Sequence, residues 1–133
     1  MRALCSLFAV CFAANFCFGQ EPIVEIKAAP DKSVFNNSTW DKPIVIKSGE
    51  EAAKHFGKEA LETITKQVDF SKQIVLIFAW RGSGGDELEY RVLESFPEQI
   101  PFSRRRGETD DLRSHSRVFA LRSNVRWSVK SPK

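Results

Sequence analysis

Residues 74–80 have the sequence Ile-Val-Leu-Ile-Phe-Ala-Trp, the longest apolar run after the first twenty residues. Seven residues are too few for a buried helix, and the run is rich in β-branched and aromatic side chains. A short apolar run of this composition is typical of a strand that is covered on both faces. We therefore expect the core of the fold to form around residues 74–80.

A glycine-rich segment, Gly82-Ser83-Gly84-Gly85, follows this strand. Because glycine accepts backbone conformations that other residues avoid, the segment is expected to turn the chain. Apolar residues then alternate with charged ones, which is typical of a half-buried strand; the apolar positions are Leu88, Tyr90 and Val92. The pattern predicts a hairpin over residues 74–94 with a glycine-rich tip.

A helical segment is predicted before the central strand. Ser48 is expected to cap its start, and Glu51 completes a capping box. Apolar residues recur from there to Val68 at spacings of three and four, with charged residues on the other face. Gly57 interrupts the pattern, and we expect it to end a first short helix as its C-terminal cap.

The remaining segments are short. Residues 23–27 and 43–47 are predicted strands, and residues 28–42 between them have the composition of a loop. Residues 96–102 carry two prolines, which favours an edge strand or an irregular segment. Residues 103–114 are highly charged and are expected to form an exposed loop.

The C-terminal residues predict a last hairpin, formed by residues 118–121 and 125–129 with the loop 122–124 between them. In such a hairpin five apolar side chains share one face: Phe119, Leu121, Val125, Trp127 and Val129. The predicted fold class is α+β, an antiparallel sheet of about five strands with one or two helices on one face.

The N-terminus resembles a secretory signal peptide. Arg2 supplies a positive charge, residues 3–18 are uncharged, and the small residue Gly19 precedes polar sequence. The apolar stretch is shorter than the ~20 residues of a spanning helix. We expect cleavage after Gly19, with an uncleaved anchor as the alternative. The predicted domains are a signal peptide at 1–19, an extended segment at 20–42 and an α+β domain at 43–133.

Export has a consequence for the cysteines. All three, at positions 5, 11 and 17, would leave with the signal peptide. We therefore predict a secreted or periplasmic protein that is free of disulfides and relies on its hydrophobic core for stability.

Few residues of the chain suggest catalysis. The two histidines, His55 and His115, are far apart in the sequence, and residues 20–133 contain no cysteine for a zinc site. We predict no catalytic, cofactor or metal site and a protein that is not an enzyme. A small hydrolase that uses His115 with Asp110 or Asp111 is the enzymatic alternative.

Positive charge is unevenly distributed. The nine arginines after residue 20 all follow residue 80, and the last 22 residues contain no acidic side chain. Arginine binds carboxylate and phosphate groups through paired hydrogen bonds. We predict a site for an acidic partner or an anionic polymer of the cell envelope, formed by Arg104, Arg105, Arg106, Arg113, Arg117, Arg122 and Arg126. Cross-strand pairing with glutamates is the alternative interpretation.

A carbohydrate-binding module is a second functional hypothesis. Sugars stack on exposed indole rings, and Trp40 lies in the predicted loop, where exposure is expected. Trp80 and Trp127 lie in predicted strands at positions that favour the core. Export makes nucleic acid an improbable ligand, and no membrane span is expected after cleavage of the signal.

Asp69-Phe70-Ser71-Lys72-Gln73 follows the predicted helix and leads into the apolar strand, the glycine-rich tip, an aromatic-bearing strand and a basic C-terminal hairpin. Over residues 44–129 this order resembles the PrcB-like domain of secreted bacterial proteins, named for an accessory subunit of a protease complex. The resemblance implies a non-catalytic module that binds or stabilises a protein partner, and it supplies no catalytic residue. We therefore expect an exported interaction or accessory module.

Overall fold

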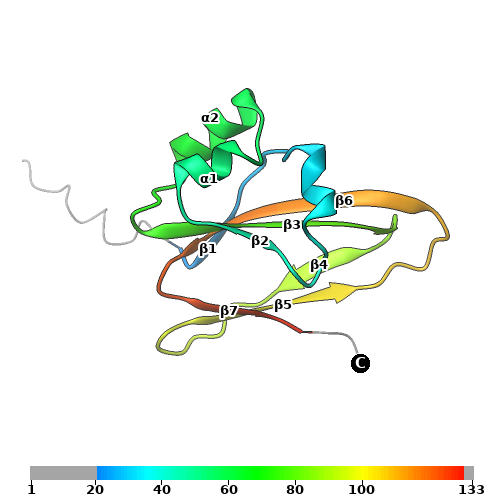
Figure 1. Ribbon diagram of the computed structural model, residues 1–133. Coiled ribbons are helices and arrows are strands. Elements are labelled where there is room, and N and C mark those ends of the chain that lie inside the picture. The colour runs from blue at the N-terminus through cyan, green and yellow to red at the C-terminus, as the bar shows by residue number, and fades with distance from the viewer. Residues whose placement is uncertain (1–20, 131–133) are drawn as a thin grey trace, which may run out of the picture.

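The computed structural model describes residues 21–130, which form three layers (Figure 1). Two helices cover one face of a four-stranded sheet, and a three-stranded sheet covers its other face. The predicted α+β class is confirmed, and so are helices on one sheet face. The prediction of one antiparallel sheet of about five strands is wrong, because the strands divide between two sheets and one pair is parallel.

The four-stranded sheet is antiparallel throughout. Its strands in spatial order are β1 (Ile23–Glu25), β6 (Leu112–Arg122), β3 (Gln73–Ser83) and β2 (Ile44–Ile46). The two central strands pair along their whole length of 11 residues, from Gln73 opposite Arg122 to Ser83 opposite Leu112. This long ladder connects the two ends of the molecule.

The three-stranded sheet has β5 (Gln99–Arg105) at its centre, between β4 (Glu87–Tyr90) and β7 (Arg126–Val129). β4 and β5 are antiparallel, whereas β5 and β7 are parallel, with Gln99 opposite Arg126. The C-terminal strand therefore runs in the same direction as the strand that begins after Pro97.

β3 is buried on both faces, as its apolar run predicts. Val75 and Ile77 pack with the helices, and Leu76, Phe78 and Trp80 pack against the second sheet. All five are buried. Alternation along one strand therefore contributes to both hydrophobic clusters of the protein.

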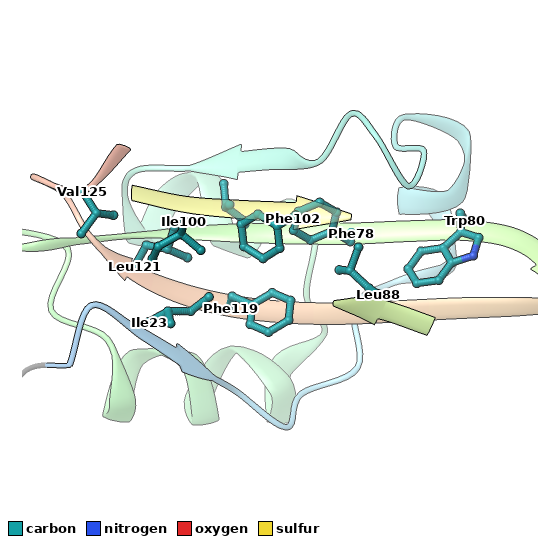
Figure 2. Close-up of a cluster of buried hydrophobic side chains, with 10 residues drawn as sticks. Ile23, Phe78, Trp80, Leu88, Ile100, Phe102, Phe119, Leu121 and Val125 are labelled. Atoms are coloured by element: carbon teal, nitrogen blue, oxygen red, sulfur yellow. The ribbon is translucent and has the colours of Figure 1, made fainter. Parts of the chain in front are cut away.

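Aromatic rings fill the space between the sheets (Figure 2). The ring centroid of Phe78 lies 4.7 Å from that of Phe102 and 6.0 Å from that of Phe119. The five C-terminal residues that were expected to share a face all lie in or against this cluster: Phe119, Leu121, Val125, Trp127 and Val129.

The helical segment is divided into α1 (Gly49–Ala53) and α2 (Lys58–Gln67). The predicted cap is confirmed, since Ser48 Oγ accepts from Glu51 N at 3.2 Å. The Glu51 carboxylate accepts from the backbone N–H of Lys47 at 3.0 Å. Gly57 does separate the helices, but the prediction that it caps the first one is wrong: it is the N-cap of α2, and Lys54 is the C-cap of α1.

Both predicted hairpins are wrong. The glycine-rich turn leads from β3 in one sheet to β4 in the other, and β4 pairs with β5. The turn after Arg122 likewise leads from β6 in the first sheet to β7 in the second. A turn that crosses between stacked sheets has the same glycine and polar signals as a hairpin turn, so only the pairing partners distinguish them.

The segment with two prolines is also mispredicted, because β5 is a central strand. Pro101 is tolerated because its nitrogen faces Arg91, just past the end of β4, while its carbonyl accepts from Arg91 N at 3.3 Å. The predicted loop 103–114 is shortened from both sides, since β5 continues to Arg105 and β6 begins at Leu112.

Residues before β2 belong to the folded body. β1 pairs with β6, the 3-10 helix η2 (Lys32–Asn36) follows, and Val34 is fully buried.

The predicted signal peptide and its three cysteines lie outside the described residues. None of the helices within residues 21–130 has both the length and the apolar character that a bilayer-spanning helix requires.

Candidate functional site

The seven arginines of the predicted anion-binding surface do not form one surface. Arg113 lies near the start of β6 and Arg122 at its end, so about 30 Å of extended strand separates them. We call these ends the glycine-loop end (residues 82–86 and 106–111) and the turn end (residues 69–72, 91–98 and 122–125). Arg106 lies at the glycine-loop end, with Arg104 and Arg105 next to it at the end of β5, whereas Arg126 lies at the start of β7, next to the turn end.

Five of these arginines contact carboxylates. The pairs are Arg104 with Asp86, Arg105 with Glu87 and Glu89, Arg113 with Asp111, Arg117 with Glu25, and Arg122 with Glu98. Within residues 21–130, Arg106 and Arg126 form no ion pair. Much of the positive charge of the C-terminal region is therefore neutralised within the fold.

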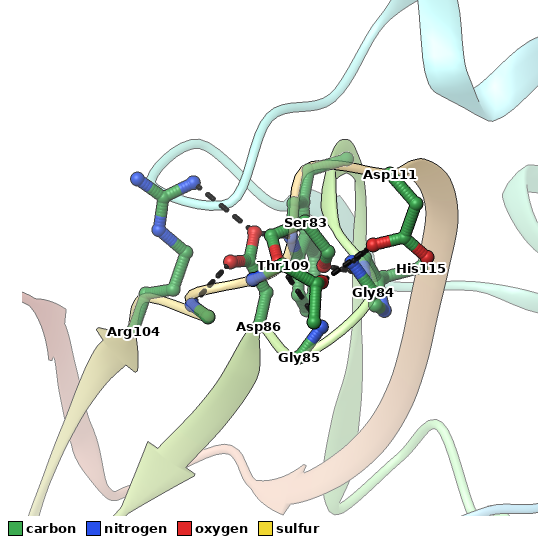
Figure 3. Close-up of polar contacts among 10 residues, drawn as sticks. Ser83, Gly84, Gly85, Asp86, Arg104, Thr109, Asp111 and His115 are labelled. Carbon is green, nitrogen blue, oxygen red and sulfur yellow. Dashed lines mark hydrogen bonds and ion pairs between the residues drawn. The ribbon is translucent and has the colours of Figure 1, made fainter.

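Asp86 organises the glycine-loop end (Figure 3). Its buried carboxylate accepts from Trp80 Nε1 at 3.2 Å and from Gly107 N at 2.8 Å, and Arg104 Nη1 lies 3.7 Å away. Burial by itself would raise the pKa of Asp86, but the two hydrogen bonds and the charges of Arg104 and His115 hold that pKa below its usual value. The residue is therefore an ionised structural acceptor.

Ser83 and Asp111 join the two loops of this end. Ser83 Oγ lies 2.6 Å from Thr109 Oγ1 and accepts from Thr109 N at 3.2 Å. Asp111 accepts from Thr109 Oγ1, from Arg113 Nε at 2.6 Å and from Gly84 N at 3.0 Å. The hydrogen bonds from Thr109, Arg113 and Gly84 hold the pKa of Asp111 well below its usual range.

Glycine is required at this end by close approach of the backbone. A Cβ on Gly107 would lie 2.4 Å from the carbonyl carbon of Gly85, and one on Gly84 would lie 2.5 Å from the Asp111 carboxylate. No glycine in residues 21–130 has a positive φ angle. The glycine-rich sequence therefore reflects the packing of one loop on the other rather than an unusual backbone conformation.

His115 lies on β6 with its ring stacked on Trp80, at 4.9 Å between centroids. Its Nε2 lies 2.8 Å from the carbonyl oxygen of Ser83, and since a carbonyl can only accept, Nε2 donates. Asp111 bonds to Thr109 and Arg113, and within residues 21–130 no hydrogen bond joins His115 to Asp110 or Asp111. The arrangement does not form the acid–base pair that the hydrolase hypothesis needs.

A hollow of about 420 Å³ opens between these loops. Its lining includes the arginines at 81, 104 and 106 and the carboxylates of Asp86, Glu108, Asp110 and Asp111. Because positive and negative groups nearly balance, this hollow does not select an anion by charge.

The three tryptophans differ in exposure from what the carbohydrate hypothesis expects. Trp40 is half-buried rather than fully exposed: its ring packs against the core, and the Arg104 guanidinium lies over it at 4.8 Å from the ring centroid. Trp80 is buried and Trp127 half-buried. Among the described residues, no three His, Cys, Asp or Glu side chains gather in a way that could hold a metal ion.

Exposed apolar residues at the turn end were missed by the sequence analysis. Phe96 has a relative exposure of 103%, and Leu93 and Val92 are 39% and 36% exposed. All three lie between β4 and β5, whereas the sequence placed Val92 and Leu93 in the predicted hairpin 74–94 and Phe96 in an edge or irregular segment. The alternation of Leu88, Tyr90 and Val92 predicted a buried position for Val92, and no pattern of the sequence reveals that Phe96 faces solvent.

Comparison of the chain with models of protein families, with curated proteins and with solved structures finds no match. The resemblance to the PrcB-like domain therefore stays a prediction from the sequence.

Proposed function

We propose that this protein is an exported, non-catalytic module that binds a partner protein through its turn end. Phe96 carries the proposal: its side chain is fully exposed, whereas the phenylalanines at 78, 102 and 119 are fully buried and those at 35 and 70 are half-buried. Exposing a phenylalanine to water is unfavourable unless another surface covers it. Aromatic residues of this kind are enriched at the centres of protein interfaces.

Neighbouring residues extend this surface. Leu93 and Val92 are partly exposed in the same connection, and Leu93 is anchored by hydrogen bonds with Gln99 at 2.8 and 3.2 Å. Arg126 N donates to Glu98 O at 2.9 Å, so the start of β7 lies directly beside the connection. The apolar side chains are therefore presented by backbone that is tied to the second sheet, which reduces the entropic cost of binding.

The charged groups of this surface favour an acidic partner. Arg91 and Arg126 are exposed and form no ion pair within residues 21–130, while Glu94 is the exposed acidic residue in the same connection as Phe96. We infer that a partner covers Phe96 with an apolar pocket and places carboxylates around it. Arg122, by contrast, is paired with Glu98 and contributes less free charge.

A non-catalytic role is supported by the glycine-loop end. Its polar groups are occupied with each other: Asp86 with Gly107 and Trp80, and His115 with the carbonyl of Ser83. Such a network stabilises the two loops, and it commits the side chains of Asp86 and His115 to structural contacts.

A capture experiment with two matched variants tests the proposal. The tagged full chain, Phe96→Ser and Leu112→Ser are each used to recover proteins from envelope extract of the source cells. Leu112 is a suitable control because it is 75% exposed and lies at the opposite end of the molecule. We expect a partner that Phe96→Ser loses and Leu112→Ser retains, and whose recovery falls with added salt. Equal recovery by both variants would contradict the proposal.

Export needs its own measurement. Mass spectrometry of the protein recovered from the cell envelope or medium should give a chain that begins at Gln20. A cytoplasmic full-length chain would refute the export part of the proposal.

A further inference from the structure

A second hollow, of about 280 Å³, lies between the two turns that flank the β3–β6 ladder at the turn end. The lining residues are Ser71, Lys72, Arg122, Ser123 and Asn124. Two of these side chains are cationic and three carry hydrogen-bonding groups; no lining residue is a carboxylate, although the Asp69 carboxylate beside the hollow accepts from the N–H and the hydroxyl of Ser71. In this respect the hollow differs from the one at the glycine-loop end, where charges balance.

The fold holds the two walls of this hollow together. Ser123 N donates to Lys72 O at 2.9 Å, directly beyond the Gln73–Arg122 pair that ends the ladder. The second turn is closed by Val125 N, which donates to Arg122 O at 3.2 Å. Lys72 and Arg122 are therefore brought to one site by backbone pairing, although fifty residues separate them in the sequence.

Several donors of this site are unused. The guanidinium of Arg122 contacts Glu98 through Nη2, and its buried Nε has no hydrogen-bond partner. Within residues 21–130, Lys72 forms no ion pair, and neither the backbone N–H of Asn124 nor the hydroxyl of Ser123 forms a hydrogen bond. A ligand that supplies oxygen acceptors would meet the Lys72 ammonium, the Ser123 hydroxyl and the Asn124 N–H, none of which is engaged by another group within residues 21–130.

We infer that this hollow binds a tetrahedral oxyanion, a phosphate or a sulfate group. The Lys72 ammonium, the Arg122 guanidinium and the Asn124 N–H of the turn can together approach such a group from several directions. The hollow is larger than one oxyanion, so an ester-linked group on an anionic polymer fits the same site. The inference does not depend on the proposed role of Phe96, since that side chain does not line the hollow.

The test is a titration of the isotopically labelled full chain, followed by the NMR shifts of its backbone amides. Inorganic phosphate, inorganic sulfate and acetate are added separately, with sodium chloride keeping the ionic strength constant so that screening does not change. We expect saturable shifts of the Lys72, Ser123 and Asn124 amides with phosphate and sulfate, and much weaker effects with acetate. The inference would be overturned by shifts that rise linearly with anion concentration without saturating. Shifts that spread over all strands that carry arginine would also overturn it.

Two charge-removing variants locate the site. Lys72→Gln should weaken binding about tenfold, because it removes one charge-assisted hydrogen bond. Lys47→Gln makes the same chemical change at an exposed position between β2 and α1, and it should leave the affinity unchanged. Equal losses in the two variants would overturn the inference.

Arg122 is tested with a substitution that keeps its charge, because removal of that charge would leave Glu98 without its partner. Arg122→Lys keeps the charge but not the planar donor group, and we expect it to weaken binding severalfold while the remaining amide spectrum is unchanged. Dextran sulfate, a polymer that carries sulfate esters, distinguishes a polymer-bound group from a free ion as the ligand. If the protein binds each sulfate ester of the polymer more tightly than it binds inorganic sulfate, the ligand is the ester form. Equal affinities support the free ion. Unchanged affinity in both Arg122→Lys and Lys72→Gln would refute the site.

Discussion

Trp80 Nε1 donates to Asp86 Oδ2 over 3.2 Å, and this hydrogen bond joins two sheets. Trp80 belongs to β3 of the four-stranded sheet, whereas Asp86 directly precedes β4 of the three-stranded sheet. The same carboxylate accepts from Gly107 N in the loop after β5. One buried side chain thus fixes three segments that come from both layers.

We predict that Asp86→Ala destabilises the protein by about 2–4 kcal/mol. The substitution leaves two buried donors, Gly107 N and Trp80 Nε1, without an acceptor, and each costs ~1–3 kcal/mol when unpaired. Urea denaturation followed by tryptophan fluorescence measures the change. The control is Glu108→Ala in the adjacent exposed loop, which should change the free energy of unfolding by less than about 0.5 kcal/mol. Equal effects of the two substitutions would contradict the role of Asp86.

Acid sensitivity is the second prediction. The folded-state pKa values of Asp86 and Asp111 are held below the usual carboxyl value of 3.8. A group with a depressed folded pKa contributes stability above its unfolded pKa and loses that contribution as the pH falls through the folded value. We therefore expect the free energy of unfolding to fall as the pH drops below about 4.

Replacement of the buried carboxylate tests this explanation. In Asp86→Asn the decline with acid should be shallower than in the unaltered protein, because one titrating group has been removed. Denaturation curves at a series of pH values between 2 and 6 provide the comparison. Identical slopes for the two proteins would show that Asp86 does not contribute to acid sensitivity.

Gly107→Ala is predicted to destabilise the protein by about 1–3 kcal/mol, because the new Cβ would overlap Gly85 backbone that cannot move independently. Gly49→Ala is the matched control, since its Cβ would meet no atom within 4 Å at the start of α1. That second change should be neutral or stabilising by about 0.5 kcal/mol, because alanine favours a helix. Thermal melts of both variants give the comparison, and a Gly107→Ala protein as stable as Gly49→Ala would refute the close-packing explanation.

Two phenylalanines provide a contrast of buried and exposed positions. Phe102→Ala should cost about 3–5 kcal/mol, since its fully buried ring packs on Phe78 and Phe119. Phe96→Ala should change the free energy of unfolding by less than about 0.5 kcal/mol, because its ring is fully exposed. Chemical denaturation measures both values. A large loss in Phe96→Ala would mean that this residue supports the fold and is not free to bind a partner.

Local sequence patterns identified most of the elements of this protein. The apolar run at 74–80 correctly predicted a strand covered on both faces, and Ser48 correctly marked the start of a helix. The shared face of Phe119, Leu121 and Val125 was also correct, although the expected hairpin was wrong. The periodicity of apolar residues depends only on which side chains are buried. A strand buries the same side chains whether the next strand along the chain pairs with it or lies in the facing sheet.

The candidate sites were harder to predict from composition. The abundance of arginine near the C-terminus suggested one positive surface, but the ladder of β3 and β6 separates Arg113 from Arg122 by its whole length. Carboxylates from distant segments, such as Glu25 beside Arg117, neutralise much of that charge. The sequence shows how many charges are present, but not which of them meet.

The amino-acid sequence by itself determined the apolar central strand, the helix cap, the α+β class and the absence of cysteine after residue 20. Only the tertiary structure decided the division into two sheets, the ion pairing of the arginines, the full exposure of Phe96 and the meeting of Lys72 with Arg122. The physical reason is the distance along the chain between the residues that interact. Secondary structure follows from side chains a few residues apart, whereas strand partners and ion pairs depend on groups that are remote in the chain until the two layers pack.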